Sequence, residues 1–262
     1  MNYNGKITLP PLIWRIFSVW YRHVRVYSQN LISNGFPPFV EPLIFLAGIG
    51  LGLGKYISTM EGIPYLQFLA VGLIVTSAMY TSAFECSFGT FIRLEFHKIY
   101  DSMLSAPITA NNLLIGEIIW AGTKGLFFST AVSSVFLLFK LVYLPYILIA
   151  PLVGFLTGIM MATLSLTITS FVNNINHFNF YFTGIISPMF FFSGVIFPLN
   201  SLPKIVRIIA EFLPLTHSIR LMRTIASGQF KAHIFFDLLY IILFSALFGY
   251  IGISKLKKKL IT

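Results

Sequence analysis

Residues 141–203 read LVYLPYILIAPLVGFLTGIMMATLSLTITSFVNNINHFNFYFTGIISPMFFFSGVIFPLNSLP, and these 63 residues contain no Asp, Glu, Lys or Arg. One helix needs about 20 apolar residues to cross a bilayer. The stretch therefore holds two membrane-spanning helices and the connection between them. A soluble core does not contain so long an uncharged run, because about 25% of the residues of a soluble domain are charged. This stretch alone predicts an integral membrane protein.

The composition of the whole chain agrees with a membrane location. Of its 262 residues, 56% are hydrophobic, 10% are charged and 28 are Phe. The net charge of +10 comes largely from basic residues near the two ends of the chain. These residues are Lys6, Arg15, Arg22, Arg25, Lys255, Lys257, Lys258 and Lys259. Basic clusters beside apolar segments mark the cytoplasmic side of a membrane rather than a nucleic-acid surface, so we predict that both termini are cytoplasmic.

Hydropathy predicts an all-α protein with six membrane-spanning helices, an even number that agrees with two cytoplasmic termini. The expected spans are 36–56, 64–92, 112–139, 143–172, a fifth that follows the polar turn 173–176 and ends near 197, and 233–254. Residues 199–231 contain apolar stretches too short to cross, and we expect a short helical segment that faces outward. This segment carries five basic residues, against the tendency of basic loops to lie inside.

Residues 10–31 form a predicted amphipathic helix that does not cross the membrane. Its polar side carries Arg15, Ser18, Arg22, Arg25 and Gln29, and its apolar side carries Ile13, Phe17, Trp20, Val24 and Leu31. Trp14, Val19 and His23 fit neither side well. A basic face and an aromatic face are typical of a helix in the plane of the membrane interface, where Arg15, Arg22, Arg25 and Trp20 would contact lipid. The alternative is a solvated helix that packs on a soluble domain.

Four glycines alternate along the first expected span. Gly48, Gly50, Gly52 and Gly54 give two interleaved pairs of small residues four apart, a spacing that lets a second helix approach closely. Although Lys55 follows, the spacing of a phosphate-binding loop is absent and no Ser or Thr comes after the Lys. We therefore interpret these glycines as a packing surface.

The loop at residues 93–107 contains a second amphipathic segment. Phe96, Ile99, Tyr100, Met103 and Leu104 would form its apolar side, with Lys98, Asp101, Ser102 and Ser105 elsewhere. Pro107 would end this segment before the next span begins. A short helix of this kind can dock into a groove of a cytoplasmic partner, and the alternative is an ordinary surface loop.

Three motifs, in order along the chain, resemble the permeases of ABC-2 type exporters. The first is Tyr100-Asp-Ser-Met-Leu-Ser-Ala-Pro107 followed by Gly116, which is similar to the cytoplasmic coupling helix of that family. The second is FFSGVIFPL at 191–199, with Gly194 and Pro198, followed by Pro203. The third is LPLTH at 213–217, with Pro214 and His217, followed by Arg220 and Arg223. Ser102 departs from the pattern, since relatives often carry a second acidic residue there.

The resemblance covers nearly the whole chain and is nearest to the permeases of nodulation-factor and drug-resistance exporters. It implies one transmembrane domain at 1–262, an interfacial elbow helix at 10–31, a coupling helix at 93–107 and an outward segment at 199–231. It also implies that two permeases pair in a bacterial inner membrane, each with a separate ATPase subunit. The expected contacts with the ATPase are Phe96, Lys98, Ile99, Tyr100, Asp101, Ser102, Met103, Leu104 and Pro107. The expected substrate is a lipid, a lipid-linked glycan or a hydrophobic drug.

The residues themselves indicate no chemistry of this chain's own. A Walker A motif, a Ser-His-Asp arrangement and a metal-ligand cluster are absent from the sequence, and the single Cys86 lies in an apolar segment. We therefore expect no catalytic residue, metal or cofactor here, with ATP and Mg bound by the partner subunit. The alternative function is a secondary transporter or a membrane scaffold without an ATPase, although no inverted repeat stands out.

Charged residues within the expected spans are candidates for function, because an ionisable group in lipid costs about 2.5–3.5 kcal/mol on insertion scales. Glu41, Glu85, Glu117 and Lys124 are the candidates for a pathway or for intramembrane pairing. Glu85 falls late in the second span. Glu117, near the cytoplasmic end of the third span, would pair with the loop at 93–107, and Glu41 would lie at headgroup depth. Glu117 and Lys124 are seven residues apart and share one helix face. Lys124 would either line a pathway or pair with a carboxylate. Asp237, near the outer end of the last span, is expected at the membrane interface.

Overall fold

A computed structural model describes residues 9–227 and 233–261. Lys6 and Lys231, two of the basic residues used above, lie outside the described residues, as does the end of the segment 199–231. Five helices within the described ranges are long and apolar enough to cross a membrane. They are Leu31–Leu51, Tyr65–Phe96, Ala110–Leu138, Leu144–Phe171 and His233–Leu260. The prediction of a multi-span helical membrane protein is thus confirmed.

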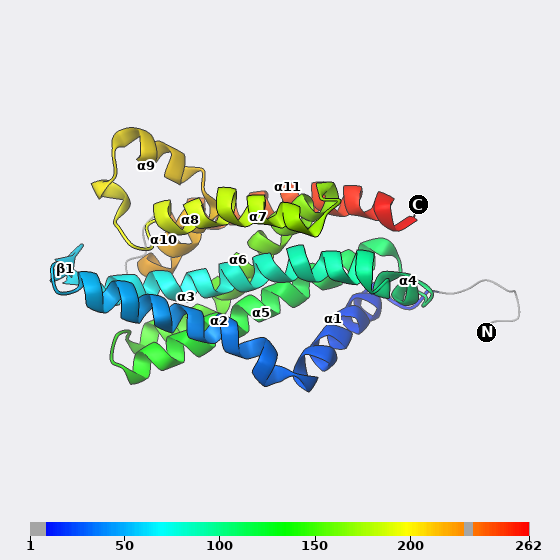
Figure 1. Cartoon of the computed structure of the whole chain (residues 1–262), viewed down its shortest axis with the longest axis horizontal. Coiled ribbons are helices and arrows are strands. Elements are labelled where there is room, and N and C mark those ends of the chain that lie inside the picture. The colour runs from blue at the N-terminus through cyan, green and yellow to red at the C-terminus, as the bar shows by residue number, and fades with distance from the viewer. Residues whose placement is uncertain (1–8, 228–232, 262) are drawn as a thin grey trace, which may run out of the picture.

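The fifth expected span is the exception to the predicted count of six. Here α7 (Phe178–Tyr181), the π-helical turn η5 (Phe182–Ile186) and α8 (Ser187–Phe192) follow one another and run along the same axis as the longer helices (Figure 1). This stretch is shorter than expected because the helix ends at Phe192 and Gly194 takes a φ of +86°, a conformation that favours glycine. By helix length, the described residues therefore give five candidate spans, and the stretch 178–192 is too short to be counted as a sixth.

Three helices form the centre of the bundle: α3 (Tyr65–Phe84), α5 (Ala110–Leu138) and α6 (Leu144–Phe171). The most apolar part of the helix that begins with α3 is 83% buried, so this helix is surrounded by protein. A Cβ on Gly158 of α6 would lie 2.9 Å from the Cα of Gly122 of α5, which shows that small residues let these two backbones approach. The long helix α11 (His233–Ile261) packs against α6 on the other side.

The first membrane-length helix is attached more loosely. It consists of α2 (Leu31–Phe45) and the π-helical turn η1 (Leu46–Leu51), and only 6% of its most apolar part is buried. It starts five residues before the predicted position 36, so Pro37 lies inside it. Of the four glycines, Gly50 faces Leu66, whereas Gly48 and Gly52 have open space around them. The predicted packing surface is therefore used only in part within this chain.

The helix α1 (Leu12–Gln29) confirms the amphipathic segment and adds a contact with the bundle that was not predicted. Val19 and His23, which fitted neither predicted side, are its buried residues and point toward α5. Ile13 and Phe17, from the predicted apolar side, are exposed. The helix presents a narrow stripe to α5 and leaves most of its large apolar side chains on the outside.

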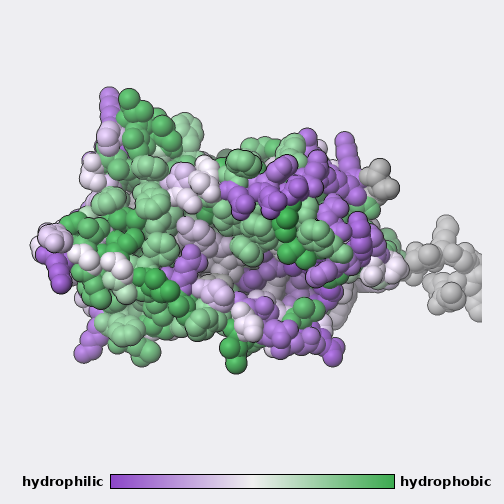
Figure 2. Space-filling view, in the orientation of Figure 1, coloured by the Kyte–Doolittle hydropathy of each residue, from purple (hydrophilic) through white to green (hydrophobic). Residues whose placement is uncertain are grey.

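The two ends of the bundle differ. α1, the short helix α4 (Ile99–Leu104) and the C-terminal end of α11 lie at one end (Figure 1). The opposite end carries the hairpin of β1 (Thr59–Met60) and β2 (Ile63–Pro64), together with α9 (Lys204–Glu211) and α10 (Pro214–Ala226). The remaining short turns are η2 (Glu85–Gly89), η3 (Ile92–Phe96), η4 (Ile175–His177) and η6 (Leu199–Ser201). On the visible face, hydrophilic residues gather toward the α4 end, and apolar ones cover most of the remainder apart from hydrophilic tips at the opposite end (Figure 2).

Candidate functional site: an ionic network and its cavity

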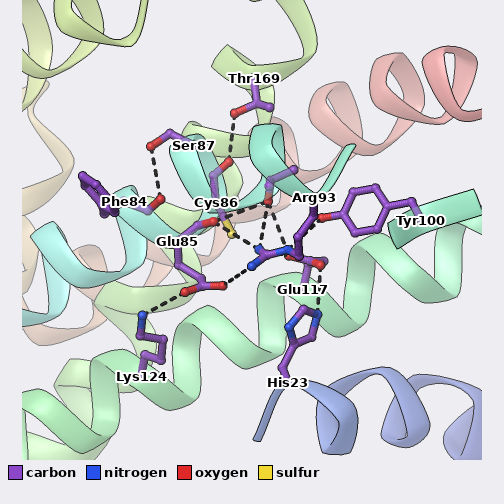
Figure 3. A network of polar contacts seen from close by, with 11 residues as sticks. His23, Phe84, Glu85, Cys86, Ser87, Arg93, Tyr100, Glu117, Lys124 and Thr169 are labelled. Carbon is purple, nitrogen blue, oxygen red and sulfur yellow. Dashed lines mark hydrogen bonds and ion pairs between the residues drawn. The ribbon is translucent and has the colours of Figure 1, made fainter. Parts of the chain in front are cut away.

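Charged side chains from four helical segments meet near the α4 end of the bundle (Figure 3). Arg93 of η3 is at the centre: its Nη1 lies 2.8 Å from Glu85 Oε1 and its Nη2 lies 2.6 Å from Glu117 Oε2. Lys124 Nζ lies 2.8 Å from the other oxygen of Glu85, and His23 Nε2 lies 2.9 Å from Glu117 Oε1. We call these five residues the ionic network. Two carboxylates and two fixed cations neutralise one another there.

The charged groups of the network are shielded from solvent. Glu117 is fully buried, and Glu85, Arg93 and Lys124 are each exposed by less than 15%. Because charges inside a protein or a bilayer are expensive without partners, such groups persist only when paired and hydrogen-bonded. The sequence left open whether Lys124 lines a pathway or pairs with a carboxylate, and the structure shows that it pairs. Glu117, as predicted, pairs with a residue of the 93–107 segment.

Arg93 also reaches the short helix α4. Its Nε donates a hydrogen bond to the hydroxyl of Tyr100 at 3.4 Å, and its Nη2 donates to the carbonyl of Glu85 at 3.3 Å. Tyr100 is fully buried, and burial raises the pKa of its hydroxyl well above the usual value, so Tyr100 stays neutral. One guanidinium therefore connects α4, the helix Tyr65–Phe96 and α5, using the fixed fork of donors that only Arg supplies.

Two π-helical turns aim the charged residues of this helix. Glu85 begins η2 and Arg93 lies in η3. Residues eight apart on an ordinary α-helix diverge by roughly 80° around the axis. The wider π turns between them reduce that angle, so both side chains face α5. Turns of this kind are rare and often occur at functional sites.

The segment 93–107 differs from the prediction in one respect. Tyr100 and Met103, expected on a face that docks into a partner, are instead buried in the chain's own core. Lys98 enters α4 with a φ of +51°, which turns the chain sharply after η3. The side chains left exposed here are Glu95, Phe96, His97, Lys98, Asp101, Ser102, Ser105, Ala106 and Pro107. Ile99 and Leu104 are half-buried.

Helix α1 is fixed to the same part of α5. Arg15 Nη1 donates to Asn112 at 3.1 Å and Trp20 Nε1 donates to Thr123 at 3.0 Å. A Cβ on Gly116 would lie 2.6 Å from the side chain of Val19, so only glycine allows the two helices to touch. Arg15 and Trp20, predicted to contact lipid, therefore also contact α5, and both remain half-buried. Arg22 and Arg25, on the remainder of the predicted polar side, are half-buried and exposed, respectively.

A cavity of about 830 Å³ lies beside the ionic network. Its lining residues come from α1, α2, the helix Tyr65–Phe96, α5 and residues 178–192, and they include His23, Tyr27, Glu41, Tyr80, Phe84, Glu85, Phe88, Arg93, Trp120, Lys124 and Phe182. Three of the four predicted pathway residues, Glu41, Glu85 and Lys124, thus border one cavity. Glu117 is fully buried and is not part of the wall. Cavities of 300–1,000 Å³ are typical of small-molecule sites. The wall of this one combines aromatic rings with polar and charged side chains.

A second cluster of charges lies at the opposite end. Asp237 Oδ1 is 2.8 Å from His217 Nδ1 and 2.7 Å from Arg220 Nη2, and Arg220 also pairs with Glu211 at 2.9 Å. Asp237 is only 1% exposed, so its carboxylate contacts these side chains rather than solvent. Tyr240 stacks on His217 with ring centroids 3.7 Å apart.

The family-like motif residues of this end surround that cluster. Pro198 and Pro203 precede η6 and α9, and Pro214 begins α10. Arg223 lies over the ring of Phe68 at 3.7 Å and donates to the Phe68 carbonyl at 3.1 Å. Burial lowers the pKa of Arg223 to about 10, which leaves it charged at neutral pH. These contacts hold α10 against α3 and α11.

Sequence reasoning did not find three members of the site. His23 fitted neither face of α1, Arg93 was assigned to a loop, and Tyr100 was assigned to a partner-facing surface. One signal was available: Glu117 and Lys124 on a single face of a buried helix require opposite charges nearby. A second helix that continues beyond position 92 would have made Arg93 a candidate partner for Glu117. The π turns that orient Arg93, however, leave no pattern in the sequence.

Comparison with known proteins agrees with this architecture. Residues 15–227 match the ABC-2 type transporter family. The chain is 35% identical to Nodulation protein J of Sinorhizobium fredii over 82% of each chain. It is 34% identical to Nodulation protein J of Rhizobium leguminosarum bv. viciae, over 86% of this chain and 87% of that one. It is 23% identical to the inner membrane transport permease YadH of Escherichia coli, over 77% and 78%. The chain therefore belongs to the ABC-2 type transporter family.

Proposed function

We propose that this chain is the permease subunit of an ATP-driven exporter. It would move an amphiphilic molecule outward across a bacterial inner membrane while a separate ATPase subunit hydrolyses ATP. Family membership supports a transport role, and a relative that is named as an inner membrane transport permease supports the location. The observation that carries the proposal is the chain of contacts from the exposed helix α4 through Tyr100 and Arg93 to Glu85 and Lys124 at the cavity wall.

The arrangement of the two ends supports a cytoplasmic site for the ATPase. Helix α4 lies at the same end as α1 and the Lys-rich end of α11 (Figure 1). Basic residues beside a span favour the cytoplasmic side, so α4 and both termini would face the cytoplasm. The ATPase would contact the exposed Phe96, Lys98, Asp101 and Ser102, since Tyr100 and Met103 are occupied within the chain.

Force on α4 would reach the cavity through rigid, paired groups. A push on this helix moves the Tyr100 hydroxyl and with it Arg93. Arg93 is held by carboxylates on two other helical segments, so its displacement shifts both Glu85 and Glu117. Lys124, paired to Glu85, then changes its place at the cavity wall. Because these contacts join α4 at one end and the cavity wall at the other, ATP binding and cavity shape would depend on each other.

A second permease copy would complete the transporter. The membrane-length helix Leu31–Leu51 is only 6% buried in its most apolar part, and its Gly48 and Gly52 are open to close approach. Both features suit a helix whose partner surface belongs to another subunit. A secondary transporter or scaffold would need neither the exposed α4 surface nor an ATPase.

The proposal is tested by purifying the tagged full chain together with its ATPase subunit and measuring ATP turnover. We expect the ATPase to co-purify and its turnover to depend on the chain. Charge reversal at the exposed Asp101 (Asp101→Arg) should reduce co-purification or turnover by at least about fivefold, because interfacial charge pairs contribute about 1 kcal/mol or more. Lys204→Glu, an exposed change at the opposite end, is the matched control. The proposal fails if the ATPase does not associate, or if Asp101→Arg behaves like Lys204→Glu.

A further inference from the structure

One charge at the cavity wall is left without a partner. Arg93 and Lys124 each contact a carboxylate of the ionic network within 2.9 Å, and Glu85 and Glu117 are used in those contacts. Glu41 of α2 borders the same cavity. Throughout the part of the chain that the structure describes, no residue forms a hydrogen bond or ion pair with Glu41. Because Glu85 and Glu117 already neutralise Arg93 and Lys124, the carboxylate of Glu41 has no fixed positive charge to pair with.

The position of Glu41 makes its carboxylate available to a ligand. Its side chain is exposed in the single chain, and it borders the cavity of about 830 Å³ on one side of α2. It also borders a shallower hollow of about 600 Å³ whose other lining residues, such as Phe36 and Ile44, are apolar. An ionised carboxylate at membrane depth is costly unless a positive group or hydrogen-bond donors accompany it.

The surrounding residues favour a particular kind of positive group. Tyr27, Tyr80, Phe84, Trp120 and Phe182 line the cavity and present aromatic rings. Aromatic faces attract cations and also accept apolar groups. The wall already shows this behaviour, since Lys124 Nζ lies 4.9 Å from the centre of the Tyr27 ring. A second cation near Glu41 would find both a carboxylate and aromatic faces.

We propose that Glu41 is a specificity residue that selects amphiphiles carrying a cationic group. This inference rests on the proposed function in one respect: the cavity is taken to receive the exported molecule. The apolar part of the ligand would contact the aromatic walls and its cation would contact Glu41. Lys124 and Arg93 would not repel that cation strongly, because Glu85 and Glu117 neutralise them.

The test compares two fluorescent probes with the same dansyl-alkyl body, one ending in trimethylammonium and one in a hydroxyl group. Binding of each is measured by titration of the purified full chain in nanodiscs of zwitterionic lipid, with empty nanodiscs as the baseline. The native chain should bind the cationic probe about tenfold more tightly than the neutral one, as expected for one partly desolvated charge contact. Glu41→Gln should reduce that ratio to about twofold or less, whereas Glu41→Asp should keep most of it.

Two further variants make the result specific. Glu61→Gln removes a carboxylate from the opposite end of the bundle and should leave the ratio unchanged. Glu41→Lys should abolish the preference and favour a sulfonate-ended probe with the same body. The inference is overturned if Glu41→Gln keeps the native ratio, or if it alters only the monomer–dimer equilibrium, which would place Glu41 at a contact between copies. Since no ATPase is present, failure here is distinguishable from failure of the proposed function.

Discussion

At the scale of single residues, Arg93 connects parts of the chain that the sequence did not link, because its position was predicted to lie in a loop. It contacts Glu85, Glu117 and Tyr100, which belong to three different helical segments. A lysine at this position would supply the charge but not the fork that reaches all three. The contribution of Arg93 is therefore geometric as well as electrostatic.

Removal of Arg93 should destabilise the chain strongly. Arg93→Ala leaves two carboxylates without their common cation, and breaking a buried pair in this way costs about 3–5 kcal/mol. Arg93→Lys should lie between Arg93→Ala and the native chain. Thermal unfolding of the detergent-purified chain, followed by tryptophan fluorescence, measures the order of the three proteins. Equal melting temperatures for the native chain and Arg93→Ala would show that the network adds nothing to stability.

The sequence predicted the positions of these charged residues only where hydropathy and helical spacing assign a residue to a span and to one face of it. The seven-residue spacing of Glu117 and Lys124 correctly placed both on one face of a buried helix. Glu85 was correctly placed late in its span. The inward turn of Arg93 and the burial of Tyr100 could not be predicted, because both depend on π-helical turns and on the left-handed conformation of Lys98, which tertiary packing imposes.

At the scale of elements, the contact between α1 and α5 joins an amphipathic surface helix to the membrane bundle. The sequence predicted an amphipathic helix whose aromatic side faces lipid. In the structure the stripe that contacts α5 is narrow, with Val19 and His23 buried, and Ile13 and Phe17 are exposed. Exposed apolar residues suit a helix that faces lipid, whereas the contact with α5 was not part of the two-sided pattern.

The approach of α1 to α5 gives a sharp prediction at Gly116. Gly116→Ala places a Cβ 2.6 Å from Val19, so α1 must move away from α5. We expect a loss of about 1–3 kcal/mol of stability from overpacking. Reduced stimulation of the ATPase should accompany that loss. The matched control is Gly184→Ala, where a Cβ has no neighbour within 4 Å. Thermal unfolding and ATP turnover of both variants measure the difference, and similar behaviour of the two would show that this close contact is not required.

At the scale of the whole molecule, the bundle has two differently built ends. One end carries α4 and the ionic network, and the other carries α9 and α10 around Asp237 (Figure 1). The basic residues of the second end conflicted with the positive-inside trend in the sequence. In the structure Arg220 is paired with Asp237 and Glu211, and Arg223 is packed against Phe68, so these two basic residues hold the fold of this end together.

Long apolar runs allowed the membrane location and most spans to be predicted, since a run of about twenty apolar residues matches the thickness of a bilayer. The fifth span was less predictable. Its helix stops at Phe192 because Gly194 turns the chain, and composition alone does not reveal such a stop. The scarcity of contacts around Leu31–Leu51 was also invisible in the sequence, because apolar residues look the same whether they face lipid, protein or a second copy.

The central claim is that movement of α4 reaches the cavity through Arg93. Trp120 is a natural reporter, because it lines the cavity and stacks on His23. We would label the chain with 5-fluorotryptophan, assemble it with the unlabelled ATPase, assign the Trp120 signal with Trp120→Phe, and record ¹⁹F NMR spectra with and without ATP, Mg and vanadate. We expect a nucleotide-dependent shift of the Trp120 signal in the native complex and its loss in Arg93→Lys, with the ATPase still bound. The same shift in Arg93→Lys would contradict transmission through Arg93.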